Sequence, residues 1–264
     1  MKISVITPNY NGARFLEQCL QSVGAQRSED LDIEHIVIDG GSSDESHAIV
    51  ERHRDQISEF VSEPDSGPAD AINKGLSRAS GEILCWLNAD DLLAPGALTR
   101  VARTMQSHPD RALSFGHCPI IDEQEREIRR GITRFKECFF PISGRFTIQC
   151  INYISQPATF FRRAAYDVAG PLREDLTAAW DYDLWLRLWR YGGAVRIEAP
   201  ALASFRWHKQ SISGQQFCTQ FREEWDVARA DSGAFSPQAF LHTGVWWGIV
   251  GSYSAMQWLR RNGE

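Results

Sequence analysis

Apolar and polar positions along the first 117 residues follow two periods. Short apolar runs rich in β-branched residues predict strands, whereas apolar residues spaced three and four positions apart predict helices. Strands alternating with helices form right-handed crossovers, so we predict an α/β fold with a mainly parallel sheet and helices on both faces. The expected strands cover residues 3–7, 33–39, 57–62, 82–87 and 112–117; the expected helices cover 13–25, 68–79 and 95–107, plus one that Ser43 or Asp44 caps and that ends at residue 53.

The second half of the chain is less regular. We expect a β-hairpin over residues 120–133 and a loop over 134–156. Strands are expected over 158–161 and 201–207, and helices over 163–169, 181–191, 215–230 and 237–260. No internal repeat or linker is visible. We therefore predict one domain over residues 1–213, with halves 1–117 and 118–213, and a C-terminal helical extension over 214–264.

Polar motifs follow three of the predicted strands, at residues 7–12, 39–41 and 88–91. In open α/β sheets this edge is where ligands bind. Any one motif alone would be best explained as an ordinary polar loop, but three on one edge favour a binding site. Adjacent carboxylates such as Asp90 and Asp91 are costly at the end of a buried strand unless a cation or partner uses them. Oxygen ligands suit Mg²⁺ or Mn²⁺, and such an ion usually holds a phosphate.

Composition narrows the classes of function. Apolar residues make up 43% and charged residues 23%, as in an ordinary soluble globular protein. The net charge of -6 argues against broad nucleic-acid binding. The six cysteines show no CxxC spacing, which favours reduced thiols in a cytoplasmic protein. The apolar stretch at residues 1–7 is too short for a signal peptide, and no run approaches the ~20 residues of a spanning helix.

Standard phosphate-binding and hydrolase motifs are missing from the sequence. No GxGxxG follows a predicted strand, and GxxxxGK[ST], HExxH and GxSxG do not occur. The predicted phosphate site therefore depends on a metal ion.

Six motifs in order resemble those of the family 2 glycosyltransferases with the GT-A fold. They are TPNYNG (7–12), VIDGGSSD (37–44), EPDSGPADAINKG (63–75), LNADD (87–91), DYDLWLRL (181–188) and FRWHKQSIS (205–213). The resemblance spans residues 3–213. It implies inverting transfer of a sugar from a nucleotide diphosphate sugar to an acceptor hydroxyl, with UDP as the default nucleotide and dTDP or GDP as alternatives. It also implies that residues 1–117 bind the donor and residues 118–213 the acceptor.

The resemblance assigns the donor site to side chains after the first four strands. Asp39 contacts the base or ribose, with a helix cap in a Gly-rich turn as the alternative. Lys74 lies near the base or phosphate, with a solvated surface lysine as the alternative. The full donor set is Pro8, Tyr10, Asn11, Asp39, Asp65, Lys74, Asn88 and Asp90.

The resemblance also implies a divalent cation, Mn²⁺ or Mg²⁺, that neutralises charge building on the β-phosphate. Asp90 would hold the ion with support from Asp91. His208 would complete the metal shell or touch the diphosphate, and its imidazole suits Mn²⁺ better than Mg²⁺. The family often has Asp where this chain has Asn88, which can bond a ribose hydroxyl or a metal-bound water but brings no charge.

Asp181 is the expected catalytic base, because a positioned carboxylate can take the proton of the attacking hydroxyl. The family commonly presents Glu-Asp where this chain has Trp180-Asp181, and Trp180 would line the acceptor sugar. The alternative interpretation of Asp181 is the N-cap of the following helix, and one residue can do both. Asp183 would point away from Asp181 on a helix.

The partners are expected to be a nucleotide-sugar donor and a glycan or lipid-linked acceptor, in cell-surface glycan assembly. The C-terminal helix carries Phe240, Trp246, Trp247 and Trp258 before Arg260-Arg261. This pattern fits a peripheral contact with the inner face of the membrane, packing on the domain, or a homodimer. Two other functions stay open: a nucleotidyltransferase or pyrophosphorylase, whose basic Gly-rich N-terminal loop is not seen, and a non-catalytic nucleotide-sugar-binding module, against which Asp90 and Asp181 argue.

Overall fold

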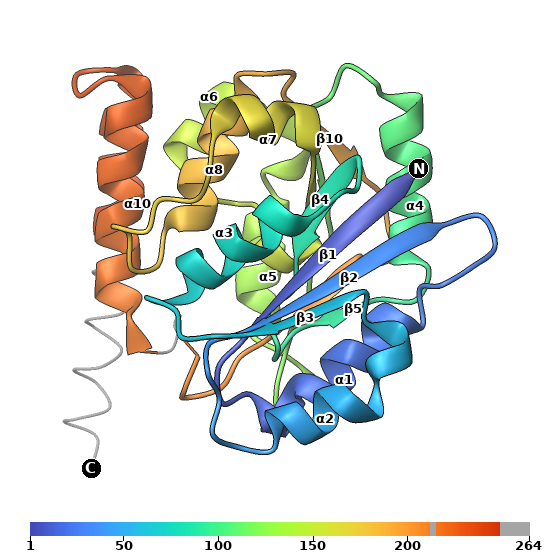
Figure 1. Cartoon of the computed structure of the whole chain (residues 1–264). Coiled ribbons are helices and arrows are strands. Elements are labelled where there is room, and N and C mark those ends of the chain that lie inside the picture. The colour runs from blue at the N-terminus through green and yellow to red at the C-terminus, as the bar shows by residue number, and fades with distance from the viewer. Residues whose placement is uncertain (212–214, 249–264) are drawn as a thin grey trace, which may run out of the picture.

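A seven-stranded sheet forms the centre of the molecule (Figure 1). The computed structural model describes residues 1–211 and 215–248. The strand order is β10-β6-β9-β4-β1-β2-β3, and only β9 runs antiparallel to its neighbours. The predicted mainly parallel sheet is confirmed. The strands are β1 (Lys2–Asn9), β2 (Asp32–Asp39), β3 (Glu59–Ser62), β4 (Ile83–Trp86), β6 (Leu113–Gly116), β9 (Thr159–Arg162) and β10 (Ala194–Ile197).

Helices cover both faces of this sheet, as the alternation of apolar residues in β1 requires. Ile3 and Val5 belong to one hydrophobic cluster with α1 and α4, whereas Ile6 belongs to another with α3 and α8. The helices are α1 (Ala13–Gly24), α2 (Ser46–Arg52), α3 (Pro68–Arg78), α4 (Ala97–Ser107), α5 (Arg130–Glu137), α6 (Arg145–Cys150), α7 (Arg163–Ala169), α8 (Trp180–Trp189) and α10 (Phe217–Ser232), followed by a helical stretch over residues 237–248.

A second, four-stranded sheet joins distant parts of the chain. Its order is β5 (Leu92–Leu93), β11 (Ala203–Arg206), β7 (Ile120–Ile121) and β8 (Glu127–Ile128). Strand β5 follows β4 closely and pairs with β11. The loop between β4 and β5 therefore lies beside the residues that follow β11.

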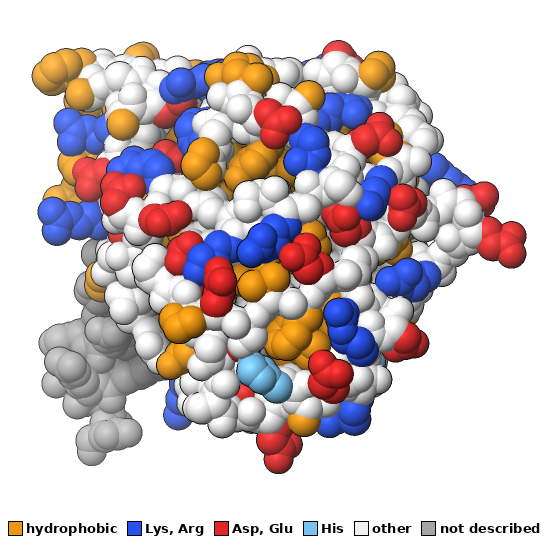
Figure 2. Space-filling view, in the orientation of Figure 1, with side chains coloured by type: hydrophobic (Ala, Val, Ile, Leu, Met, Phe, Trp, Pro, Cys, Tyr) orange, Lys and Arg blue, Asp and Glu red, His pale blue; other side chains and the backbone are white. Residues whose placement is uncertain are grey.

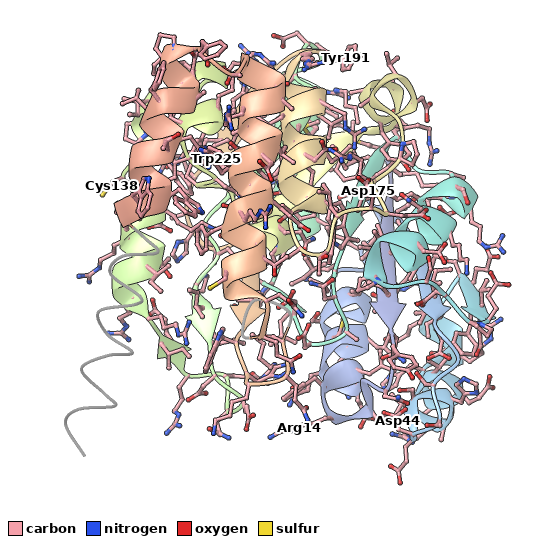
Figure 3. The ribbon with its side chains drawn as sticks, turned by 90° about the vertical axis from the view of Figure 1, so that its left-hand side faces the viewer. Arg14, Asp44, Cys138, Asp175, Tyr191 and Trp225 are labelled. Atoms are coloured by element: carbon pink, nitrogen blue, oxygen red, sulfur yellow. The ribbon has the colours of Figure 1, made fainter. Side chains whose placement is uncertain are left out.

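The second half of the chain packs on the sheet through aromatic residues of α8. Trp185 stacks on Trp86 of β4 with ring centroids 5.3 Å apart. Helix α10 contributes Val227 and Ala228 to the same cluster. In Figure 3, α10 and the stretch over residues 237–248 lie side by side, and Trp225 Nε1 donates a hydrogen bond of 2.8 Å to Thr243 Oγ1. The described part of the C-terminal extension is therefore packed into the domain.

Several predicted element boundaries are wrong. The hairpin ends at Ile128 rather than at residue 133, because α5 begins at Arg130. The predicted loop over residues 134–156 contains the end of α5, all of α6 and one 3₁₀ turn over 140–142. These helices have only six to eight residues, too few to show a helical period clearly. The short strands β5 and β10 were also not predicted.

The predicted last helix, over residues 237–260, is described only as far as residue 248. Trp258 and Arg260-Arg261 lie outside the described residues, so the interpretations that depend on them stay predictions. Within the described ranges, none of the helices combines the length and the apolar character needed to cross a membrane.

Gly75 of α3 lies where the helix packs directly on β1, and an added Cβ would overlap the Cγ2 of Ile6. We expect Gly75→Ala to lower the free energy of unfolding by about 1–3 kcal/mol through overpacking, although alanine is favoured over glycine in helices by up to about 1 kcal/mol. Gly131 of α5 has open space at the same position and serves as the control. Urea unfolding of both variants checks this; equal stability of the two would contradict the packing argument.

Candidate active site

Strands β1, β2 and β3 end in register at one edge of the sheet. The strand register aligns Asn9 with Asp39 and Asp39 with Ser62. The fully buried Asp39 carboxylate accepts hydrogen bonds from Asn9 Nδ2 at 2.7 Å, from Ser62 Oγ at 2.8 Å and from the backbone N–H of Ser42 at 2.9 Å. His47 Nε2 lies 2.9 Å from the same carboxylate. Asp39 therefore ties three strand ends together.

Burial alone would raise the pKa of Asp39, but hydrogen bonds from Ser42, His47 and Asn9 outweigh it and hold the pKa well below its ordinary value. The group stays a carboxylate at neutral pH. The loop after β2 passes close to Asp65, since a Cβ added at Gly40 would overlap the Asp65 carboxylate. Burial raises the pKa of Asp65, against a hydrogen bond from Gly67 N–H.

The loop after β1 is fixed by Asn11, whose backbone is left-handed at φ 49°. Its Oδ1 accepts a hydrogen bond from Ser43 N–H at 2.9 Å, and its own N–H donates to Ser42 Oγ at 2.8 Å. The neighbouring Tyr10 is 68% exposed, which leaves its ring free to stack on a ligand. Pro8 lines the cavity beside them.

The loop after β4 meets the segment after β11. His208 Nε2 lies 3.0 Å from Asp90 Oδ2, and the imidazole packs on the ring of Phe15. His208 Nδ1 is buried, and no hydrogen-bond partner for it is found among the described residues. The sequence motifs after two different strands therefore converge in one acid–imidazole pair.

Arg206 holds together the segments that form this pair. Its fully buried side chain donates to the backbone oxygens of Asp90 at 2.8 Å and of Asp122 at 3.1 Å, and to Gln18 Oε1 at 2.9 Å. Its backbone N–H donates to Asp91 Oδ1 at 2.8 Å. Sequence reasoning missed Arg206 as a site residue, although it lies in the FRWHKQS motif.

Asp91, a predicted metal ligand, does not line the cavity. Its carboxylate is fully buried and bonded to Arg206 N–H and, at 3.2 Å, to Asn88 Nδ2. Burial, followed by the charge of Asp90, raises the pKa of Asp91 well above its ordinary value. Its geometry fits an internal brace, and a direct metal contact stays a prediction.

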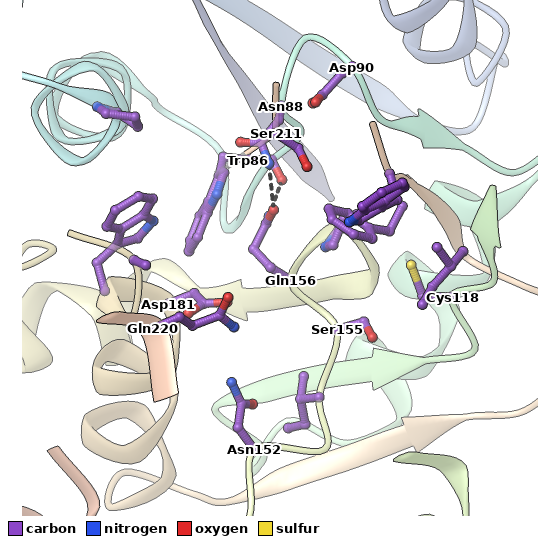
Figure 4. Close-up of a pocket in the computed structure, with 18 of the residues that line it drawn as sticks. Trp86, Asn88, Asp90, Cys118, Asn152, Ser155, Gln156, Asp181, Ser211 and Gln220 are labelled. Carbon is purple, nitrogen blue, oxygen red and sulfur yellow. Dashed lines mark hydrogen bonds between the residues drawn. The ribbon is translucent and has the colours of Figure 1, made fainter. Parts of the chain in front are cut away.

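Gln156 links the two halves of the site. Its Nε2 donates to the Trp86 backbone oxygen at 2.7 Å, and its Oε1 accepts a hydrogen bond from Asn88 Nδ2 at 3.3 Å (Figure 4). Asn88 therefore lies between Asp91 and Gln156, on the wall of the cavity.

Asp181 lies in the first turn of α8 and lines the same cavity. Ala179 occupies the N-cap position, so the helix-cap alternative for Asp181 is wrong. Burial raises the pKa of Asp181 to about 6, against a hydrogen bond from Tyr182 N–H and the charge of Lys136. Asp183 points elsewhere and pairs with Arg187 at 2.8 Å. A carboxyl group with a raised pKa that is still mostly ionised at neutral pH suits a general base.

Helix α10 holds the segment that precedes Asp181. The Glu223 carboxylate accepts hydrogen bonds from three successive backbone N–H groups, those of Thr177 at 2.8 Å, Ala178 at 2.8 Å and Ala179 at 3.1 Å. It satisfies the backbone N–H groups of the segment that leads into α8. No sequence pattern indicated this contact.

One cavity of about 2090 Å³ joins these groups. Figure 4 shows Asp90 and Asn88 at one end of the close-up and Asp181, Gln220 and Asn152 further along it. Of the predicted residues, Pro8, Tyr10, Asn11, Asp65, Asn88, Asp90, His208 and Asp181 line this cavity, as does Trp180.

Lys74 and Asp39 do not line the cavity. Lys74 donates to the Pro64 backbone oxygen at 3.0 Å and pairs with Glu63 at 3.4 Å and Asp70 at 3.3 Å, so it supports the loop that carries Asp65.

In the view of Figure 2, acidic and basic side chains are mixed and form no continuous basic area.

The donor set at one end of the cavity suits a divalent cation only in part. Across the described ranges, no group of three or more His, Cys, Asp or Glu side chains is arranged to hold a metal ion. Asp90 and His208 offer one carboxylate and one imidazole. Mg²⁺ is commonly bound by one or two carboxylates plus the phosphates of a substrate. The pair therefore fits a cation that arrives with a diphosphate.

Comparison with known proteins identifies one family for this chain. The model of glycosyl transferase family 2 matches residues 4–169. A PGL/p-HBAD biosynthesis glycosyltransferase of Mycobacterium bovis is 30% identical over 190 residues, which cover 69% of this chain and 68% of the relative. An uncharacterized glycosyltransferase of Nostoc sp. is 34% identical over 51% of this chain, and one of Rickettsia conorii is 25% identical over 85%. This chain spans only 42% and 37% of their respective lengths.

Solved structures share the fold. The S. aureus protein TarS, residues 1–349 in complex with UDP-GlcNAc, gives a TM-score of 0.68 at 19% identity, over 91% of this chain and 69% of that one. The mannosyltransferase PcManGT of Pyrobaculum calidifontis, in complex with GDP-Man and Mn²⁺, gives 0.68 at 20% identity, over 99% and 76%.

Arg206→Met keeps the side-chain volume but leaves buried carbonyl oxygens without a donor. We expect a loss of more than about 3 kcal/mol in the free energy of unfolding. Arg126, whose side chain is 74% exposed in its pair with Asp122, is the control, and Arg126→Met should cost less than about 1 kcal/mol. Denaturant titration measures both variants. A loss at Arg206 no larger than that at Arg126 would refute its role in holding the site.

Proposed function

Because this chain belongs to the family 2 glycosyltransferases and has their GT-A fold, we propose that it transfers a sugar from a nucleotide diphosphate sugar to an acceptor hydroxyl with inversion. The observation that carries this proposal is the single cavity that connects the Asp90–His208 pair with Asp181. Family membership leaves the nucleotidyltransferase alternative without support, and a carboxyl group with a pKa near neutrality at Asp181 argues against a purely binding module.

The donor occupies the edge of the sheet in this proposal. Pro8, Tyr10 and Asn11 wall the nucleoside, with the exposed Tyr10 ring available for stacking. Asp65 faces the same space. Asp39 and Lys74 act indirectly, since one ties the strand ends and the other supports the Asp65 loop. We propose UDP as the nucleotide; related folds have been solved with UDP-GlcNAc and with GDP-Man.

Asp90 and His208 would hold a divalent cation, Mn²⁺ or Mg²⁺, at the end of the site where the diphosphate binds. The bound ion supplies positive charge beside the leaving phosphate. Asn88 offers its amide to a ribose hydroxyl, and Gln156 and Asp91 keep that amide in place. Asp91 acts as a brace in this proposal.

Asp181 takes the proton of the acceptor hydroxyl as the oxygen bonds to the anomeric carbon of the donor sugar. The bond from that carbon to the β-phosphate oxygen breaks, and the nucleoside diphosphate leaves with the electron pair. Attack from the face opposite the leaving group inverts the anomeric configuration. The apolar surroundings that raise the pKa of Asp181 make its carboxylate a stronger base than an exposed one.

We propose a glycan or lipid-linked acceptor, used in cell-surface glycan assembly at the cytoplasmic side of the membrane. Exposed apolar residues of the described C-terminal region support a contact with a membrane surface or a second copy: Phe235, Phe240 and Trp247 are 88%, 65% and 65% exposed.

Asp90→Ala removes the cavity-facing carboxylate of the cation site. We expect the affinity for UDP in the presence of Mn²⁺ to fall by about 10-fold or more, whereas binding without metal stays as weak as in the wild type. Calorimetric titration of UDP with and without Mn²⁺ measures this. The exposed Asp55→Ala is the matched control. Unchanged Mn²⁺-dependent affinity in the Asp90 variant would remove Asp90 from the cation site.

Asp181→Asn keeps the shape of the side chain but cannot take a proton. We expect UDP binding to stay intact and transfer to fall by about 100-fold or more. In the wild type the ionised form is the active one, so the rate should fall about tenfold per pH unit below a pKa of about 6 and level off above it. Initial rates of transfer, measured across about pH 4.5–8.5 in steps of ~0.5, give this pH dependence. Near wild-type transfer by Asp181→Asn would show that another group is the base.

A further inference from the structure

A second buried carboxyl group lies in the acceptor half of the cavity, and the mechanism above does not use it. Glu224 of α10 is 4% exposed and lines the same cavity as Asp181. Across residues 1–211 and 215–248, no lysine, arginine or histidine side chain forms an ion pair with it. Burying a carboxyl group without a cation is costly, so its presence calls for an explanation.

The contacts of Glu224 leave hydrogen-bonding capacity toward the cavity. Its Oε1 accepts hydrogen bonds from Asn152 Nδ2 at 3.1 Å and from Gln220 Nε2 at 3.1 Å. A carboxylate has about four acceptor positions, and these contacts use two. The Oδ1 atom of Asn152 is buried, and the described part of the chain offers it no partner. Figure 4 shows Gln220 close to Asp181, with Asn152 in the same part of the cavity.

Anchoring of α10 does not explain Glu224. Other residues of this helix already attach it to the domain: Glu223 bonds the N–H groups of residues 177–179, and Asp231 pairs with Arg145 at 2.7 Å and with Arg190. Glu224 and Gln220, four positions apart on one face of α10, both line the cavity instead.

The protonation of Glu224 depends on its burial and on the other side chains that line the cavity. Burial raises the pKa of Glu224 to about 7, hydrogen bonds from Gln220 and Asn152 lower it, and the nearby charge of Asp181 raises it. Lys136 of α5 also lines the cavity and acts on both carboxyl groups. Two carboxyl groups in one apolar-walled space are typical of a functional site.

We propose that Glu224 is an acceptor-binding residue, which accepts a hydrogen bond from an acceptor hydroxyl other than the one that Asp181 deprotonates. This inference rests on the proposed transfer reaction and narrows its acceptor to a compound with at least two hydroxyl groups, a sugar unit rather than a simple alcohol. Trp180 on the same wall offers an aromatic face of the kind that packs on the apolar face of a pyranose. Helix α10 thereby becomes part of the acceptor site.

Glu224→Gln keeps the size of the side chain and removes its charge. Asp226→Asn makes the same change at an exposed position of the same helix and is the matched control. The probes are UDP-sugars with Mn²⁺ and a panel of p-nitrophenyl hexosides, from which the glycoside that the wild type uses best is taken. We expect Glu224→Gln to raise the KM for that glycoside by about 10–100-fold, with the Kd for UDP within about 2-fold of the wild type.

Mono-deoxy analogues of the same glycoside identify the hydroxyl group. One analogue should lose about 10-fold or more in kcat/KM with the wild type and with Asp226→Asn, but less than about 3-fold with Glu224→Gln, because the neutral amide oxygen there is a much weaker acceptor than the carboxylate. Glu224→Asp, which keeps the charge but shortens the side chain, gives the same comparison if Glu224→Gln does not fold.

An unchanged KM for the glycoside in a folded Glu224 variant would overturn this inference alone, since transfer itself would still be observed. Equal losses with a deoxy analogue in the wild type and the Glu224 variant would also overturn it. If the wild type transferred no sugar from any UDP-, dTDP- or GDP-sugar to any acceptor, the proposed function would be wrong as well.

Discussion

The site depends on the buried guanidinium of Arg206. This side chain and its own backbone N–H bind the loop after β4, a neighbouring turn and α1 at once, through Asp90, Asp91, Asp122 and Gln18. A buried charge is tolerated only when its donors are satisfied, so these segments are held where the guanidinium requires them. The end of β11 then delivers His208 to Asp90. This clamp reinforces the pairing of β5 with β11, which brings the two loops together although they lie far apart in the sequence.

The acidic groups of the molecule differ in pKa because they receive different numbers of hydrogen bonds. Asp39 is also buried, yet hydrogen bonds from Ser42, His47 and Asn9 keep its pKa low and fix it as a structural anion. Burial raises the pKa of Asp181 to about 6 and that of Glu224 to about 7, since few donors oppose it there. Asp39, beside the donor end of the cavity, therefore organises the loops there as a permanent charge. The other end holds groups that exchange protons near neutral pH.

The sequence predicted the features that local physics determines. Period-two and period-3.6 patterns located the first four strands and their helices, and parallel strands bring their ends to one edge, where Asn11 and Asp90 were expected. Asp65 came from the family resemblance, and all three residues line the cavity. Arg206 and Glu224 were not, because their roles arise only from contacts with residues far away in the chain. On α10, Glu224 reads like any solvated acid of an amphipathic helix beside Glu223. The helices α5 and α6 were missed because short elements show too little of their period.

The two halves of the cavity are therefore built in different ways. The donor half consists of βα loops whose positions follow from a register of adjacent strands, Asn9 beside Asp39 beside Ser62. The acceptor half has no such frame and is assembled from α8, α10 and the segment around Asn152, held by side chains such as Glu223. A substitution on the inner face of α10 can thus alter the acceptor half while the strand register, and with it the donor half, stays intact. This separation allows one nucleotide-sugar site to be combined with different acceptor surfaces, without rebuilding the sheet that carries the chemistry.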